Sequence, residues 1–226
     1  MGKRATALKA DYGARKTKLA AADDNALKAW EAVRDGAVVC RRCHLHEHAT
    51  QTVFGEGPVD AAILFVGEQP GDREDLAGRV FVGPAGQLFD RALSDSGIDR
   101  TRTYVTNAVK HFKFARHGKR RIHEKPDGAE IQACRWWLEQ ERALIRPPIT
   151  VALGATAARA LFGKVVTISK LRGAAQALPD GSEAWVTVHP SYLLRVPEAE
   201  RKREEYDKFV ADLKRIGKRA KALSRP

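Results

Sequence analysis

Three cysteines and seven histidines are the side chains of this 226-residue sequence with the clearest capacity for chemistry. Cys40 and Cys43 form a C-R-R-C pair, and Cys134 follows far along the chain. An odd number of cysteines argues against a disulfide framework, whereas a C-x2-C pair is typical of metal binding. A structural zinc ion or an iron–sulfur cluster usually takes four ligands, so one ligand remains to be found.

A histidine is expected in the fourth place, because imidazole replaces thiolate on iron as it does on zinc. The spacing alone does not choose between four candidates, which are His44, His46, His48 and His111. The alternative is that Cys134 is a buried helix thiol and that the C-R-R-C pair binds nothing.

The second segment with chemical potential is 110-KHFKFARHGKRRIHEKP-126, which surrounds His123 with cations. Residues 110–125 hold seven Lys or Arg against Glu124, a local charge of +6. Such cations bind phosphates, and they lower an imidazole pKa by like-charge repulsion, which keeps the ring neutral and nucleophilic. From the residues alone a solvated basic loop is the favoured interpretation, because charge runs usually mean exposure, and a nucleic-acid contact beside a nucleophilic histidine is the alternative.

The net charge of +12 lies mainly at the two ends of the chain. Residues 1–19 contribute +5 and residues 214–226 contribute +6. We expect basic arms at 1–22 and 217–226 that attract phosphate, on either side of one domain at 23–216. The sequence has no apolar run of membrane-spanning length and no secretory signal at its N-terminus, so we expect a cytoplasmic monomer without a membrane partner.

Strands that alternate with helices must position these side chains. Apolar runs predict buried strands at 61–67, 103–109, 149–154 and 184–190, the last in a hairpin with 174–178. Helices are predicted at 24–39, 87–97, 128–145, 155–162 and 198–216. The order indicates a three-layer α/β domain around a mostly parallel sheet, in which ligands bind beyond the carboxyl ends of the strands. Glu68 follows the first of these strands, and Asn107 and His189 lie near the carboxyl ends of two others.

Several ordered motifs resemble those of the uracil-DNA glycosylase superfamily, and within it the UdgX subgroup, which is related to the family 4 iron–sulfur glycosylases. They are 67-GEQPGDREDLAGRVFVGPAGQLFDRAL-93, 104-YVTNAVKHFKF-114, 119-KRRIH-123 and 189-HPSYLLR-195. The resemblance covers about residues 36–213. It implies a three-layer α/β/α fold with a four-stranded parallel central sheet.

The resemblance also implies a [4Fe–4S] cluster. Its ligands would be Cys40, Cys43, His111 and Cys134, and His111 stands where the hydrolytic relatives carry a cysteine. The sequence contains no Walker A or G-x-G-x-x-G pattern, so we expect no nucleotide cofactor.

The same resemblance assigns the uracil-binding residues. His189 would donate to uracil O2 as charge develops there, and Asn107 would read the edge of the base. Phe81 would stack on the uracil base after the base has flipped out of the DNA helix, and Gln69 would also bind uracil. DNA contacts are expected from Lys119, Arg120, Arg121 and Ser191.

In the UdgX subgroup the histidine of K-R-R-I-H attacks deoxyribose C1′ itself, which here implies His123, with Glu68 orienting or polarising it. We therefore expect a single-turnover, suicide enzyme that stays attached to uracil-containing DNA, with single strands preferred. One alternative is a hydrolytic glycosylase that turns over with water, in which His123 only contacts DNA. The other is a non-catalytic, metal-stabilised nucleic-acid-binding module.

Overall fold

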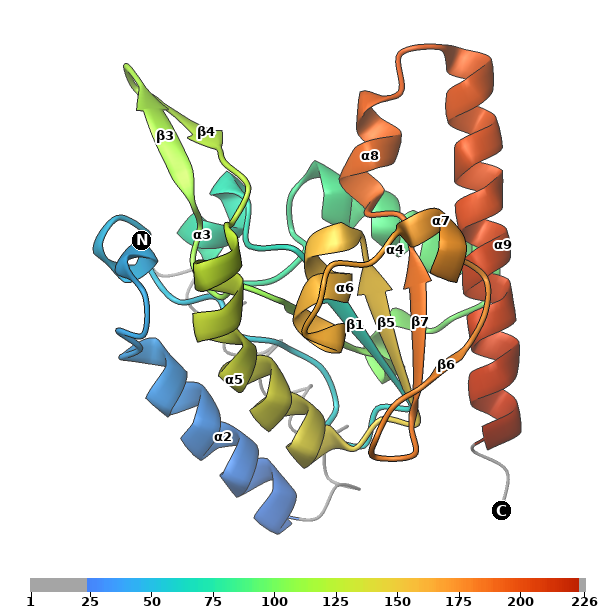
Figure 1. Cartoon of the computed structure of the whole chain (residues 1–226), viewed down its shortest axis with the longest axis horizontal. Coiled ribbons are helices and arrows are strands. Elements are labelled where there is room, and N and C mark those ends of the chain that lie inside the picture. Colours follow the sequence, from blue (N-terminus) through green and yellow to red (C-terminus); the bar gives the residue numbers. More distant parts are fainter. Residues whose placement is uncertain (1–23, 224–226) are drawn as a thin grey trace, which may run out of the picture.

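The computed structural model of the protein describes residues 24–223; residues 1–23, which include the arm expected at 1–22, and residues 224–226 lie outside that description. A central sheet lies between two layers of helices (Figure 1). Its strand order is β2-β1-β5-β7-β6. The strands are β1 Ile63–Gly67, β2 Tyr104–Asn107, β5 Ile149–Leu153, β6 Gln176–Ala177 and β7 Glu183–Thr187.

The expected fold class is confirmed. β2, β1, β5 and β7 run parallel in adjacent pairs, and the two-residue β6 adds a short antiparallel edge through the predicted hairpin with β7. β1 and β5 are buried along their whole length, which is typical of strands covered by helices on both faces.

Two apolar cores occupy the two faces of the sheet, because successive strand residues point to opposite sides. Leu64 and Val66 belong to the first core, together with side chains of α2 Asp24–Val38, α5 Gly128–Ile145 and α6 Ala155–Phe162. Ile63 and Phe65 belong to the second core, with side chains of α4 Pro84–Ser96, α8 Pro190–Arg195 and α9 Ala199–Leu223. The sheet is thereby fixed from both sides, and its strand ends can hold side chains in defined positions.

Local signals set several helix ends. α5 begins with a capping box in which the Asp127 side chain accepts from the backbone N–H of Glu130, and the Glu130 side chain accepts from the backbone N–H of Asp127. α4 ends at Gly97, which has a φ of +73°. α9 continues past the expected boundary at residue 216 to Leu223, because Gly217 and Ala220 are buried against the neighbouring layer.

Two segments for which the sequence predicted neither helix nor strand contain regular structure. The long Gly/Pro-rich loop after β1 holds α3 Asp72–Ala77. The basic segment forms a hairpin of β3 Phe114–His117 and β4 Arg120–His123, turned at Gly118 with a φ of +57°. The other short helices are η1 His44–Glu47, η2 Arg100–Arg102 and α7 Ile168–Leu171. No helix among residues 24–223 combines the length and apolarity needed to cross a membrane.

Candidate active site and cysteine centre

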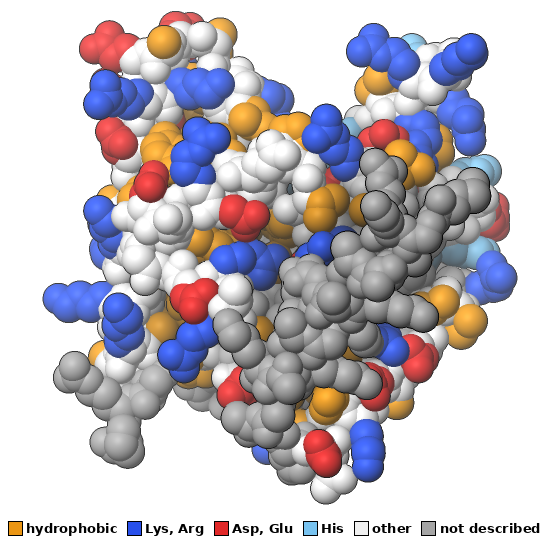
Figure 2. Space-filling view, turned by 180° about the vertical axis from the view of Figure 1, so that it is seen from behind, with side chains coloured by type: hydrophobic (Ala, Val, Ile, Leu, Met, Phe, Trp, Pro, Cys, Tyr) orange, Lys and Arg blue, Asp and Glu red, His pale blue; other side chains and the backbone are white. Residues whose placement is uncertain are grey.

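The carboxyl ends of the parallel strands bring the predicted polar residues to one edge of the sheet. Glu68 follows β1, Asn107 is the last residue of β2, and His189 follows β7. The register aligns Gly67 with Asn107. In the space-filling view a notch separates the hairpin, whose tip carries Lys, Arg and His side chains, from the arm formed by α8 and α9 (Figure 2).

Asn107 and Phe81 approach each other over Gly67, where a side chain has no room. A Cβ atom at Gly67 would lie 2.3 Å from Asn107 Oδ1 and 2.8 Å from Phe81 Cζ. Phe81 has a φ of +55°, an uncommon conformation for a bulky residue, and its ring packs at 5.1 Å from Phe89 and 6.1 Å from His189. The arrangement places an aromatic face and a buried amide together.

His189 is held in one tautomer at the start of α8. The backbone N–H of Ser191 donates to Nδ1 at 3.1 Å, so Nδ1 carries the lone pair and Nε2 carries the proton. Burial lowers the pKa of His189 to about 4, although the charge of Glu68 acts in the opposite direction. The ring is therefore a neutral N–H donor near pH 7. Ser191 Oγ also contacts Nδ1 at 2.8 Å and accepts from Arg195, so Ser191 orients the ring.

His123 faces Glu68 across the edge of the sheet. Its Nε2 lies 3.3 Å from Glu68 Oε1, and the Thr156 hydroxyl donates to Glu68 Oε2. Burial alone would raise the pKa of Glu68, but the hydrogen bonds from His123 and Thr156 outweigh it, and the pKa is lowered. Glu68 is thus a carboxylate near neutral pH. The His123 side chain is 48% exposed, so a ligand can reach it from solvent.

Gln69 clamps the base of the hairpin. Its Nε2 donates to the backbone oxygens of Lys113 at 3.1 Å and Glu124 at 3.0 Å, and its Oε1 accepts from the backbone N–H of Lys113. Both donors of the amide are occupied in this way. The Gln69 side chain therefore fixes the hairpin, and the uracil contact expected of Gln69 stays a prediction.

The three cations of K-R-R-I-H point in different directions. Lys119 and Arg120 are exposed at the hairpin tip. Arg121 instead turns inward, where its Nε donates to Asp72 at 2.6 Å and its Nη1 donates to Asp75 at 2.5 Å. Asp75 is fully buried, so Arg121 neutralises a carboxylate that lacks solvent. The charge of Arg121, expected to hold phosphate, is engaged within the protein and anchors the hairpin to α3.

The three thiols belong to or pack against the core on the face of the sheet that α2 and α5 cover. Burial raises the pKa of the Cys134 thiol to about 12, and the nearby Cys43 and Cys40 act in the same direction. Cys40 Sγ accepts from the Trp137 indole at 3.1 Å, and Cys134 Sγ accepts from the backbone N–H of Lys110 at 3.2 Å. A metal ion deprotonates such buried thiols through its own charge.

His111 is one candidate histidine that lies beside the thiols in a suitable form. It lines a cavity of about 170 Å³ together with Cys40 and His46. Thr52 donates its hydroxyl proton to Ala37 O, so His111 Nε2 donates to Thr52 Oγ1 and Nδ1 keeps its lone pair. Burial lowers the pKa of His111 to about 4, which keeps the ring neutral, as a metal ligand must be.

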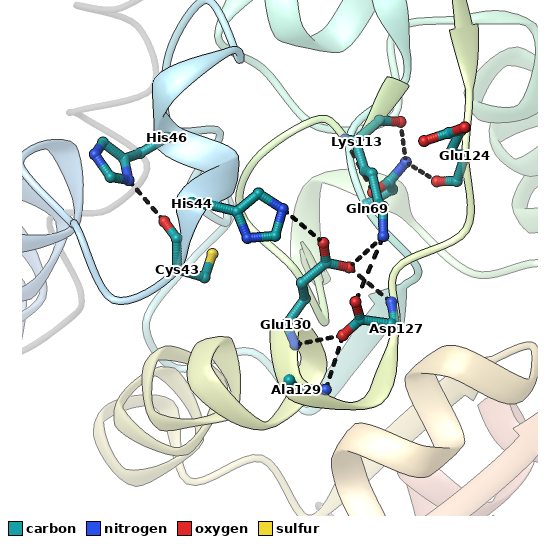
Figure 3. Close-up of polar contacts among 9 residues, drawn as sticks. All are labelled: Cys43, His44, His46, Gln69, Lys113, Glu124, Asp127, Ala129 and Glu130. Atoms are coloured by element: carbon teal, nitrogen blue, oxygen red, sulfur yellow. Dashed lines mark hydrogen bonds and ion pairs between the residues drawn. The ribbon is translucent and has the colours of Figure 1, made fainter. Parts of the chain in front are cut away.

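Two of the other histidines beside the pair, His44 and His46, also have polar partners (Figure 3). His44 Nε2 lies 3.3 Å from Glu130 Oε1, and His46 Nδ1 lies 2.6 Å from the backbone oxygen of Cys43. Within residues 24–223, no three His, Cys, Asp or Glu side chains lie close enough to share one metal ion. In a [4Fe–4S] cluster each ligand binds a different iron, so the four donors need not meet at a point. The donor types and their common location fit a cluster better than a single ion.

Some residues of the site were not predicted from the sequence. Thr156 supports Glu68 from the start of α6, and Asp72 and Asp75 hold Arg121 from α3. The signal for the last two was the acid pair at i and i+3 in 72-DRED-75, which lies on one face of a helical turn. Lys113 and Glu130 form an ion pair of 3.0 Å below the hairpin, which no sequence pattern indicated.

Comparisons with known proteins agree with this geometry. Residues 54–214 match the family described as the uracil DNA glycosylase superfamily. The Type-4 uracil-DNA glycosylase of Thermotoga maritima is 40% identical over 191 residues, which cover 83% of this chain and 96% of that protein. Those of Archaeoglobus fulgidus and Sulfurisphaera tokodaii are 35% and 32% identical over 79% and 81% of this chain, and 86% and 84% of theirs. The chain therefore belongs to the uracil-DNA glycosylase superfamily.

Proposed function

We propose that the protein excises uracil from DNA and becomes covalently attached to the resulting sugar through His123, as the UdgX-like motifs imply. The observation that carries the proposal is the pair of His123 and Glu68, whose Nε2 and Oε1 atoms are 3.3 Å apart at the edge where Asn107 and His189 also lie. A histidine oriented by a carboxylate has the arrangement of an activated nucleophile.

The reaction would proceed in two linked changes. The bond between C1′ and uracil N1 breaks, and uracil leaves with the electron pair while neutral His189 donates from Nε2 to its developing oxyanion. A ring nitrogen of His123 then forms a bond to the cationic C1′. The alkylated imidazole carries a positive charge that the Glu68 carboxylate stabilises. No water-activating side chain is assigned to reverse this bond, so the adduct would persist.

Substrate binding would divide between the base and the strand. Phe81 stacks on the flipped base and Asn107 reads its edge, which requires the base to leave a duplex or to start unpaired. The exposed Lys119 and Arg120 at the hairpin tip would contact phosphates, and Ser191 would contribute beside His189. A single-stranded substrate is favoured because unpairing then costs nothing.

A [4Fe–4S] cluster would be the resident cofactor, held by Cys40, Cys43, His111 and Cys134. When bound, it supplies a cross-link between the segment after α2, the end of β2 and α5. This role is structural, and the chemistry at C1′ belongs to the protein side chains.

A denaturing gel separates the proposal from the nearest other function, a hydrolytic glycosylase like the Type-4 relatives. We expect a single-stranded, uracil-containing oligonucleotide to give a band that survives SDS and heat. His123→Ala should abolish this band, and His123→Ser should behave alike. Abasic product with free protein would instead favour water as the nucleophile. If neither the adduct nor abasic product forms, the protein would be a non-catalytic binding module.

A further inference from the structure

Glu130 lies between residues 40–47, here called the cysteine segment, and the base of the hairpin (Figure 3). Its side chain is 2% exposed and comes from the first turn of α5, one turn before Cys134. Oε1 lies 3.3 Å from His44 Nε2, next to Cys43 in the chain, and makes no hydrogen bond. Oε2 lies 3.0 Å from Lys113 Nζ and accepts from the backbone N–H of Asp127 at 2.7 Å.

Lys113 carries the connection onward to both partners of the His123–Glu68 pair. The backbone oxygen of Lys113 accepts from the side-chain amide of Gln69, and the backbone N–H of Lys113 donates to the oxygen of that amide. Gln69 directly follows Glu68 in the chain. The backbone oxygen of Lys113 also accepts from the backbone N–H of Glu124, the neighbour of His123. The Lys113 side chain is 21% exposed and its ammonium lies between Glu130 and the more exposed Asp127. A continuous set of contacts therefore runs from His44 through Glu130 and Lys113 to the residues that directly follow Glu68 and His123 in the chain.

We propose that Glu130 is a positioning residue that ties the base of the His123 hairpin to α5 and to the cysteine segment through Lys113 and His44. Capping of α5 alone does not require a carboxylate at position 130. Glutamine at the same position completes a capping box equally well, and it avoids a buried carboxylate with an unbonded oxygen. A carboxylate is accounted for by the ammonium of Lys113 at one oxygen and the His44 ring beside the other.

The kinetic test of this inference, which measures adduct formation, rests on the proposed function. Hydrogen exchange is therefore measured as well, because it does not depend on that function. Glu130→Gln keeps the cap and removes the charge; Lys113→Met removes the partner and keeps the apolar stem. The control is Glu139→Gln, which removes a half-exposed carboxylate of the same helix that is paired with Arg135. Each protein is purified with its iron, and iron content and melting temperature are measured.

The first measurement is hydrogen exchange at the amides of residues 40–47 and 113–124. Faster exchange in both segments is expected for Glu130→Gln, faster exchange at 113–124 for Lys113→Met, and wild-type exchange for Glu139→Gln. The double variant should be no worse than the poorer single variant, because the two side chains act as one unit. Wild-type exchange in Glu130→Gln would overturn the proposal, whatever the chemistry of His123.

The second measurement follows uracil release and adduct formation in the same single-turnover samples. Misplacement of a reacting group by about 1 Å costs up to roughly 100-fold in rate, so Glu130→Gln should lower adduct formation by roughly 10- to 100-fold relative to uracil release. An unchanged ratio, with a wild-type protein that does form the adduct, would also overturn the proposal. A wild-type protein that releases uracil without any adduct would instead reject the proposed function, and hydrogen exchange would then decide the positioning role.

Discussion

The substitution Gly67→Ala tests whether Asn107 and Phe81 together form the pocket for the flipped base. The added Cβ would lie 2.3 Å from Asn107 Oδ1 and 2.8 Å from Phe81 Cζ, whereas ordinary contact begins at 3.4 Å. The buried amide must therefore retreat by about 1 Å, which lowers the rate of uracil excision by roughly 100-fold. Overpacking of this kind costs about 1–3 kcal/mol in the free energy of unfolding.

The assay is single-turnover release of uracil from a single-stranded oligonucleotide, with a urea titration of each variant. Gly97→Ala is the matched control, because its φ of +73° strains an alanine while no atom lies within 4 Å of the new Cβ. The control should lose about 1 kcal/mol of stability and excise uracil at the wild-type rate. Wild-type excision by Gly67→Ala would refute the assignment of Asn107 and Phe81, and slow excision by both variants would attribute the effect to stability.

Three further predictions concern the groups around this pocket. His189 has a pKa of about 4 against an ordinary 6.5, so the unfolded chain binds the proton first as the pH falls. Stability should therefore drop between these two values by at most about 3 kcal/mol, and urea titrations of His189→Asn should lack this contribution. Arg121→Met leaves the buried Asp75 carboxylate without its cation, so we expect the protein to lose roughly 3 kcal/mol and the hairpin to be cleaved faster by protease. An unaltered unfolding curve would show that Asp75 does not need Arg121. Removal of iron by a chelator should abolish the visible absorption and lower the melting temperature; a colourless, zinc-loaded protein would exclude the cluster.

The sheet and its main helices could be predicted because their signals are local. The fully apolar runs at β1 and β5 indicate strands buried on both faces, and the Asp127 cap with Glu130 marks the start of α5. The rule that ligands bind beyond the carboxyl ends of parallel strands indicated where the site lies, and the roles of its residues came from the resemblance to the superfamily. The register between Gly67 and Asn107 then brought the predicted residues together.

The hairpin escaped prediction because its order comes from distant partners. Seven cations in a short stretch are typical of a solvated loop, and they hide the alternation of inward and outward side chains. Arg121 is held by α3 and Lys113 by α5, while Gln69 joins both ends of the hairpin. None of these pairs is close in sequence, so neither periodicity nor spacing indicates them. The extension of α9 was missed for a similar reason. Gly217 disfavours a helix and Lys218 is typical of an exposed tail, so only the packed structure shows that the helix continues to Leu223.

The measurement that tests the central claim most directly is peptide mapping by mass spectrometry after reaction with a single-stranded, uracil-containing oligonucleotide. The DNA is digested by nuclease, the protein by protease, and each histidine peptide is fragmented. We expect the mass of a deoxyribose remnant on His123 alone, with one uracil released per protein attached. Unmodified His123 with abasic DNA accumulating over many turnovers would contradict nucleophilic attack by the protein.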